Sequence, residues 1–138
     1  TGPSRESEGL ILAITKALTS AGASSDDIGV IAAHGTGTVY NDAMEMRAFR
    51  AVFKNNAVPV YSIKGGIGHT MGAAGLVETI IAQRALRERM TPPTVNMKES
   101  DDDAAGWVSD RGRPIERGVM ALVTNAGFSG VNTALVLA

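Results

Sequence analysis

The sequence predicts an α/β domain in which helices cover both faces of one mixed sheet. Three observations favour this class. Apolar residues alternate between helical and strand spacing along the chain, glycine-rich turns follow two of the strands, and two further strands close the sequence. With 138 residues, of which 44% are hydrophobic and 20% charged, the chain has the composition of a single globular domain over 1–138.

Each element of the first half has its own signal. Helical spacing of apolar residues from Leu10 predicts a first helix that stops at Gly22. The apolar run 28–33 then predicts a buried strand. Asp42 and Glu45 have the spacing of a capping box, so we expect them to open a second helix.

The second half repeats the alternation. Residues 58–63 predict another buried strand, a glycine-rich turn follows over 64–69, and a long helix runs from about 71 to 89. Pro92 and Pro93 then break the helical pattern, and the polar stretch 98–114 is interpreted as a surface loop. The two closing strands are expected to pair as a hairpin at the end of the chain: 119–124 and 131–137.

Composition and charge exclude several classes of function. The formal net charge of −1 and an aromatic content of 4% leave neither a basic field nor a stacking platform for nucleic acid. No apolar run reaches membrane-spanning length, so we expect no membrane partner. The absence of cysteine excludes a cysteine nucleophile from this chain and suits a reducing compartment, so we expect a cytoplasmic protein.

The two histidines of the chain occupy corresponding places. His34 and His69 each lie in a glycine-rich turn after an apolar strand, and Lys64 stands five residues before the second histidine. Ligands of open α/β sheets bind where the strands end. A single histidine there would simply satisfy a hydrogen bond of its turn, but two of them with a lysine favour a functional site.

Other interpretations of these turns fail in detail. The P-loop pattern is missing because Lys64 precedes the glycines, and no G-x-G-x-x-G run follows a strand. Two histidines without cysteine are also a poor ligand set, so no metal is expected.

Three segments resemble motifs of the β-ketoacyl-acyl-carrier-protein synthases and stand in that family's order. They are A-H-G-T-G-T at 33–38 with Asp42 and Glu45 behind it, K-G-G-I-G-H-T-M-G-A-A-G at 64–75, and N-A-G-F-S-G-V-N-T-A-L-V-L at 125–137. The chain is therefore similar, over nearly its whole length, to the carboxy-terminal half of such a ketosynthase.

The resemblance implies a thiolase-like fold of two similar halves, each a five-stranded mixed sheet with helices on its faces. It also implies a decarboxylative Claisen condensation, which joins an acyl group on a cysteine to malonyl-carrier protein in fatty-acid or polyketide synthesis. The cysteine would lie in the amino-terminal half, so this chain alone should be inactive. The implied partners are that half, acyl carrier protein and a second copy of the complete enzyme, with no cofactor beyond the carrier's phosphopantetheine.

The resemblance further assigns roles to individual residues. We expect His34 and His69 to donate N–H groups to the thioester oxygen as charge develops there, each donor being worth about 3 kcal/mol. Lys64 would organise the turn of the second histidine, although most lysines are simply exposed.

Three more residues match positions around the substrate in the family. Phe128 would be a gate whose backbone N–H completes an oxyanion hole, unless it is an ordinary core aromatic. Thr36 and Thr38 would hydrogen-bond the phosphopantetheine arm, although hydroxyls in turns usually bond their own backbone.

Two other functions stay open at this point. A non-catalytic subunit that sets chain length or mediates interaction would function normally after both histidines are changed. A thiolase-type enzyme would act without decarboxylation, but the H-G-T-G-T run resembles the decarboxylating branch. Family members that only shape the pocket usually lack the histidines, so their presence favours a catalytic parent.

Overall fold

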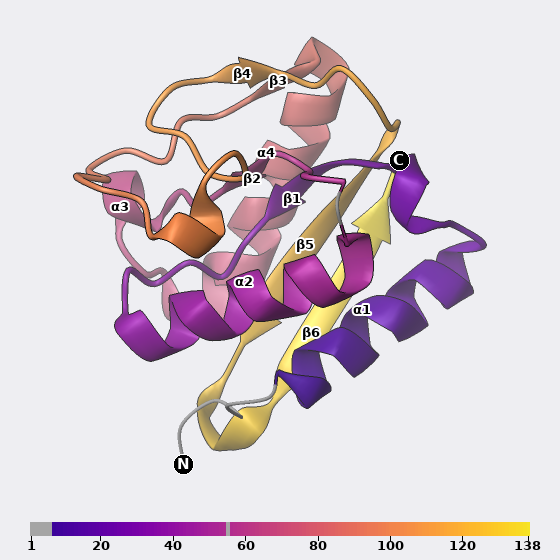
Figure 1. Ribbon diagram of the computed structural model, residues 1–138, viewed down its shortest axis with the longest axis horizontal. Helices are drawn as coiled ribbons and strands as arrows, with labels where there is room; N and C mark the ends of the chain where they lie inside the picture. The colour runs from indigo at the N-terminus through magenta and orange to yellow at the C-terminus, as the bar shows by residue number, and fades with distance from the viewer. Residues whose placement is uncertain (1–6, 55) are drawn as a thin grey trace.

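A mixed sheet forms the centre of the domain in the computed structural model, which describes residues 7–54 and 56–138 (Figure 1). Its strands, in spatial order, are β2 (Val60–Tyr61), β1 (Ile28–Ala32), β5 (Met120–Ala126) and β6 (Asn132–Leu137). β1 runs parallel to β2 and β5, whereas β6 returns antiparallel to β5. The mixed sheet and the closing hairpin are as predicted.

The fifth strand expected from the family resemblance is reduced to one bridge. Val108 pairs in parallel with Val60, whose N–H donates to the Trp107 carbonyl at 2.8 Å. The described part of the sheet therefore has four strands rather than five. β3 (Met90–Thr91) and β4 (Arg113–Pro114) form a separate antiparallel pair, so the predicted surface loop is partly ordered and buries Trp107.

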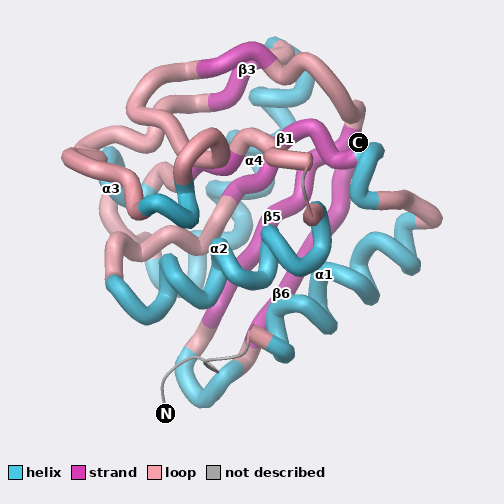
Figure 2. The backbone as a smooth tube through the Cα atoms, viewed as in Figure 1, coloured by secondary structure: helices cyan, strands magenta, loops and turns pink. Residues whose placement is uncertain are grey.

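Helices cover both faces of the sheet (Figures 1 and 2). α1 (Glu8–Ala21) and α2 (Val39–Phe53) lie on one face, and α4 (Ala74–Glu88) packs against β1 and β5 on the other. Side chains alternate along β1: Ile31 belongs to the core under α1 and α2, and Val30 and Ala32 belong to the core under α4. Among the described residues, no helix is long and apolar enough to cross a membrane.

The ends of several elements differ from the expectation. α1 does end at Gly22, which adopts the left-handed conformation with φ 61°. α2 begins at Val39 with Thr38 as its N-cap, so the capping box predicted for Asp42 and Glu45 is wrong. The turn over 64–69 contains a short helix, α3 (Lys64–Ile67), and the long helix is preceded by a separate 3₁₀ turn at Met71–Ala73. Further 3₁₀ turns occupy Ser25–Asp27, Asp102–Ala104 and Phe128–Gly130.

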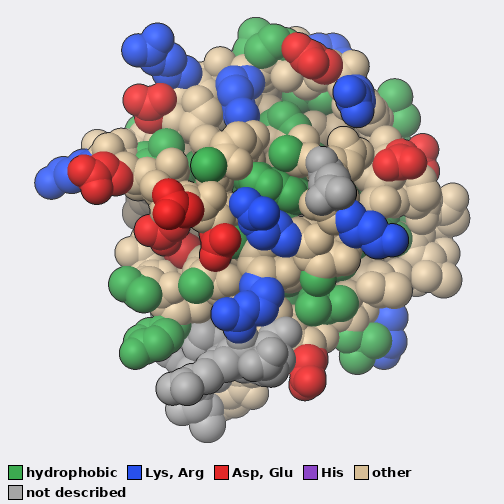
Figure 3. Space-filling view, in the orientation of Figure 1, with side chains coloured by type: hydrophobic (Ala, Val, Ile, Leu, Met, Phe, Trp, Pro, Cys, Tyr) green, Lys and Arg blue, Asp and Glu red, His purple; other side chains and the backbone are tan. Residues whose placement is uncertain are grey.

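Charged side chains of both signs occur on the face of the molecule that α1 and α2 cover. In Figure 3, a group of aspartates and glutamates lies beside the lysines and arginines at the centre of this face. This distribution agrees with the formal net charge of −1 and with the absence of a basic field.

Two segments touch backbone to backbone where β1 begins. Gly118 has φ 65°, and a Cβ atom on it would overlap the backbone of Ile28 and Gly29. The register of β1 against β5 also shifts between Ile28 and Val30. Glycine at 118 thus lets the segment before β5 cross the start of β1, and this crossing sets how the two strands align.

We expect Gly118→Ala to lower the free energy of unfolding by about 2–5 kcal/mol, because it adds steric overlap to left-handed strain. The matched control is Gly22→Ala, since Gly22 has φ 61° but no atom within 4 Å of its added Cβ. That control should lose only about 1–2 kcal/mol. Denaturant unfolding measures both variants, and equal losses would contradict the close backbone contact.

Candidate active site

The two histidines meet beyond the ends of two neighbouring parallel strands. His34 lies in the turn between β1 and α2, and His69 follows α3, which itself comes after β2. Their ring centroids lie 5.2 Å apart, with an interplanar angle of 78°. The fold therefore brings two imidazoles from distant parts of the chain to one place.

The side chain of Glu45 holds the turn that carries His34. Its Oε1 accepts the His34 backbone N–H at 2.8 Å and the Thr124 hydroxyl at 3.0 Å. Its Oε2 accepts the Gly35 N–H at 2.7 Å and the Asn41 amide at 2.9 Å. Burial raises the pKa of Glu45, while these four hydrogen bonds act in the opposite direction. The buried Glu45 side chain thus fixes the backbone of the turn at His34 and Gly35. The sequence spacing of Glu45 from Asp42 does not reveal this role.

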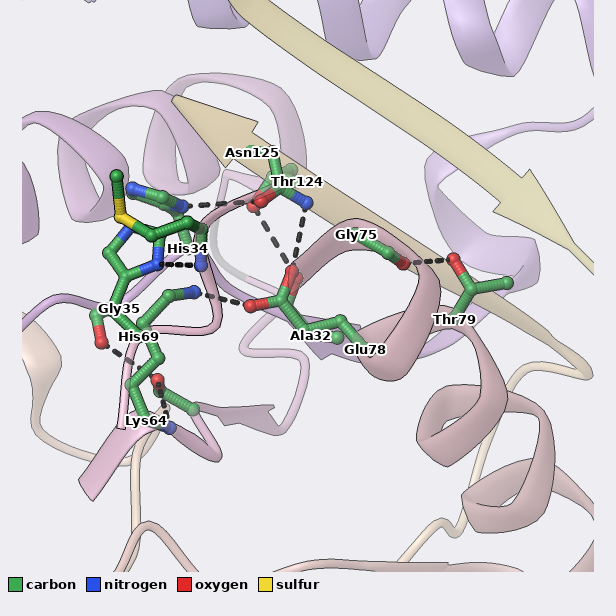
Figure 4. Close-up of polar contacts among 12 residues, drawn as sticks. Ala32, His34, Gly35, Lys64, His69, Gly75, Glu78, Thr79, Thr124 and Asn125 are labelled. Carbon is green, nitrogen blue, oxygen red and sulfur yellow. Dashed lines mark hydrogen bonds and ion pairs between the residues drawn. The ribbon is translucent and has the colours of Figure 1, made fainter. Parts of the chain in front are cut away.

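Lys64 is buried and forms an ion pair with Glu78 of α4 (Figure 4). The side chains of the two residues are 6% and 2% exposed, so the pair is shielded from water. The expectation of an exposed lysine does not apply here. Because Lys64 opens α3, the pair ties the segment before His69 to the first half of α4.

Asn125 extends this pair to the first histidine. Its Nδ2 donates to Glu78 Oε2 at 2.8 Å, and its Oδ1 lies 3.3 Å from His34 Nδ1. A polar chain thus runs from Lys64 through Glu78 and Asn125 to His34 (Figure 4). Sequence reasoning missed Glu78 and Asn125. The available signal was a single carboxylate within the apolar body of the helix.

The environment of His34 keeps its ring neutral. Burial, the positive charge of Lys64 and, to a smaller extent, His69 lower the pKa of His34 to about 4, although the contact with Asn125 acts to raise it. The imidazole is therefore uncharged at physiological pH. His34 therefore does not have to lose a proton before it can act as a neutral imidazole.

His69 is more exposed and has a different partner. Its Nδ1 accepts the backbone N–H of Met71 at 3.0 Å, so the proton of the neutral ring resides on Nε2. Gly68, with φ 77°, and Met71, with φ 52°, give the backbone the sharp path that brings this N–H back onto the ring. The geometry leaves Nε2–H of His69 as a hydrogen-bond donor.

A cavity of about 890 Å³ opens beside these residues. Its lining includes Gly35, Thr36, Lys64 and His69, together with the segment 94–101. The hydroxyls of Thr36 and Thr38 bond each other at 2.9 Å, but Thr38 does not line the cavity. Phe128 lies beyond the end of β5, and its side chain lies outside the described part of the structure, so its gate role stays a prediction.

Metal ligation has no evident place in the site. Within residues 7–54 and 56–138, no group of three or more histidine or carboxylate side chains is arranged to hold a metal ion.

Comparison with known proteins gives one matching family. Residues 1–98 match the family described as Beta-ketoacyl synthase, C-terminal domain. The 3-oxoacyl-[acyl-carrier-protein] synthase 2 of Coxiella burnetii is 35% identical over 99% of this chain, which covers 34% of that protein. The chain thus spans about a third of the length of the curated relatives that it matches.

Solved structures agree with this match. One match is a chain in the structure of a type II polyketide synthase acyl-carrier protein in complex with its ketosynthase. Its TM-score is 0.88 at 27% identity, and the match covers 99% of this chain and 34% of that chain. The ishigamide ketosynthase/chain length factor matches with a TM-score of 0.85 and 32% identity, covering 99% and 33%. The fold is thiolase-like, and the chain belongs to the β-ketoacyl synthase family, whose C-terminal domain it contains.

Proposed function

We propose that the protein containing this chain is a β-ketoacyl-acyl-carrier-protein synthase that joins an acyl-cysteine to malonyl-carrier protein with loss of carbon dioxide. The observation that carries the proposal is the meeting of two imidazoles, 5.2 Å apart, in turns at the carboxyl edge of the sheet. The lowered pKa of His34 and the Nε2–H of His69 suit a site that stabilises a developing oxyanion by hydrogen bonds from neutral imidazoles, without a charged imidazolium.

The reaction explains why such groups are needed. When the malonyl carboxylate leaves as carbon dioxide, the electron pair of the broken C–C bond moves onto the thioester oxygen. The resulting enolate carbon then attacks the carbonyl of the acyl-cysteine, and the cysteine thiolate leaves. A hydrogen-bond donor aimed at the thioester oxygen lowers the barrier of the first step. We assign this role to His69 Nε2–H, with His34 at its side and Lys64 organising the turn.

The nucleophile and several partners must come from outside this chain. The sequence has no cysteine, so the acyl-cysteine belongs to the rest of the protein. Leu76 and Ile80 lie one turn apart on α4 and are 66% and 58% exposed, which supports packing of the amino-terminal half on this helix. A homodimer of the complete synthase and a cytoplasmic location remain part of the proposal.

Acyl carrier protein is the proposed substrate carrier. The support is a solved relative in which a ketosynthase is complexed with its acyl-carrier protein. Thr36 lines the cavity and offers a hydroxyl at its wall, which suits the phosphopantetheine arm. Phe128 retains its proposed role as the gate of the acyl pocket, and Thr38 supports the Thr36 hydroxyl. No further cofactor is proposed.

Replacing either histidine should remove most of the activity. In the full-length protein, His69→Ala should lower the rate of malonyl decarboxylation by about 10²–10³-fold, the typical effect of one lost oxyanion donor. His34→Ala should also lower the rate, because the His34 ring lies 5.2 Å from the His69 ring and is expected to contact the same substrate. Release of carbon dioxide from labelled malonyl-carrier protein measures both variants.

The substitution Arg84→Ala is the control for this experiment, because the Arg84 side chain is 77% exposed and does not line the cavity. It should retain full activity. Unchanged decarboxylation in both histidine variants would instead support a non-catalytic chain-length-setting or interaction subunit.

Breaking the buried ion pair should lower the free energy of unfolding far more than breaking an exposed pair. Lys64→Ala leaves Glu78 buried without its cation, which should cost about 3–5 kcal/mol. Arg84→Ala breaks the exposed i,i+4 pair with Glu88 and should cost only about 0.3–0.5 kcal/mol. Denaturant unfolding of both variants measures the difference, and similar costs would contradict the stabilising role of the buried pair.

A further inference from the structure

The two imidazoles differ in what faces their Nδ1 atoms. His69 Nδ1 is 3.0 Å from a backbone N–H, which can only donate. His34 Nδ1 is 3.3 Å from a side-chain amide oxygen of Asn125, which can only accept. If both contacts are hydrogen bonds, the neutral rings must carry their protons on different nitrogens.

The orientation of the Asn125 amide decides the contact with His34. Glu78 Oε1 is engaged by the Lys64 cation, so the carboxylate is ionised and accepts hydrogen bonds only. The Asn125 atom 2.8 Å from Glu78 Oε2 must then be the NH₂ group, because an amide oxygen there would face another acceptor. The amide oxygen is consequently the atom that faces His34 Nδ1.

We propose that Asn125 is a positioning residue that holds neutral His34 as the Nδ1–H tautomer and leaves the lone pair of Nε2 as its free hydrogen-bonding position. His69 is the opposite tautomer, with its proton on Nε2. The pair of rings therefore has one imidazole that donates and one that accepts. This replaces the expectation that both rings donate to the same oxygen.

The surrounding charges keep this arrangement in place. The titratable groups that act on His34 are Lys64 and His69, and both disfavour a second proton on its ring. The ring consequently stays neutral at physiological pH, and a neutral imidazole has one donor and one acceptor. The Lys64–Glu78 pair holds Asn125, and Asn125 selects which nitrogen of His34 is the donor.

The tautomer can be read directly in the full-length protein labelled with ¹⁵N-histidine. Two-bond ¹H–¹⁵N correlation spectra at neutral pH distinguish a protonated Nδ1 from a protonated Nε2. Signals are assigned by their loss in His34→Gln and in His69→Gln. We expect the Nδ1–H pattern for His34 and the Nε2–H pattern for His69 in the unmodified protein.

Two substitutions test the part played by Asn125. Asn125→Leu keeps the size of the side chain but removes its oxygen, so the His34 signals should shift toward the Nε2–H pattern. Asn125→Asp keeps an oxygen opposite Nδ1 and should preserve the original tautomer of His34. Its second oxygen would face Glu78 Oε2, to which the Asn125 amide donates, so this variant should also unfold more readily. The condensation rate should fall about tenfold or more in Asn125→Leu, as for other imidazoles held in the wrong tautomer.

The signals of His69 are the internal control and should not change in either variant. Asn56→Leu, at an asparagine that follows α2 and contacts Asp26, is the matched substitution away from the site and should leave both histidines unchanged. An Nε2–H pattern for His34 in the unmodified protein would overturn the inference without any variant. Persistence of the Nδ1–H pattern in Asn125→Leu would overturn the role of Asn125.

The inference rests on the proposed function only for its effect on rate. If the expected tautomers are found but malonyl substrates are not turned over, the proposed function fails and the positioning role stands. If turnover is found with two Nε2–H rings, the proposed function stands and the positioning role fails.

Discussion

The buried ion pair between Lys64 and Glu78 connects the two turns that carry the histidines to α4 and β5. Lys64 begins the short helix before His69, Glu78 belongs to the central helix α4, and Asn125 carries the contact onward to His34. Removing two charges from water is costly unless both find partners. This pair meets that condition, because the carboxylate binds the lysine with one oxygen and the Asn125 amide with the other. The interactions within the pair offset the cost of burying its charges, and they hold the turns of His34 and His69 in a fixed position relative to each other.

A second buried carboxylate acts in parallel on the other face of the sheet. Glu45 comes from α2 and holds the backbone of the His34 turn, and Thr124 of β5 donates to it. Thr124 and Asn125 are consecutive in β5, so their side chains point to opposite faces. One reaches Glu45 on the α2 side and the other reaches Glu78 on the α4 side. The end of β5 thus joins the two carboxylate networks through Thr124 and Asn125.

The sequence predicts the elements better than it predicts the networks. The alternation of helix and strand spacing and the glycine turns place both histidines at strand ends, which the fold requires for their rings to meet. The spacing of Glu45 from Asp42 predicts a capping box, because spacing alone cannot show that a carboxylate turns back to the preceding loop. Glu78 and Asn125 were missed because their partners are far away in sequence. The fifth strand became a single bridge at Val108 because the chain next to it turns through the Trp107 segment instead of extending.

The proposed function requires His69 Nε2–H to donate to the thioester oxygen of a substrate that also contacts the His34 ring. The most direct measurement is a crystal structure of the full-length protein with a stable malonyl analogue in which an amide replaces the thioester. We expect the carbonyl oxygen of the analogue at about 3 Å from His69 Nε2, with the His34 ring in contact with the same ligand. A ligand bound in the pocket with its carbonyl oxygen out of hydrogen-bond reach of both rings would contradict it.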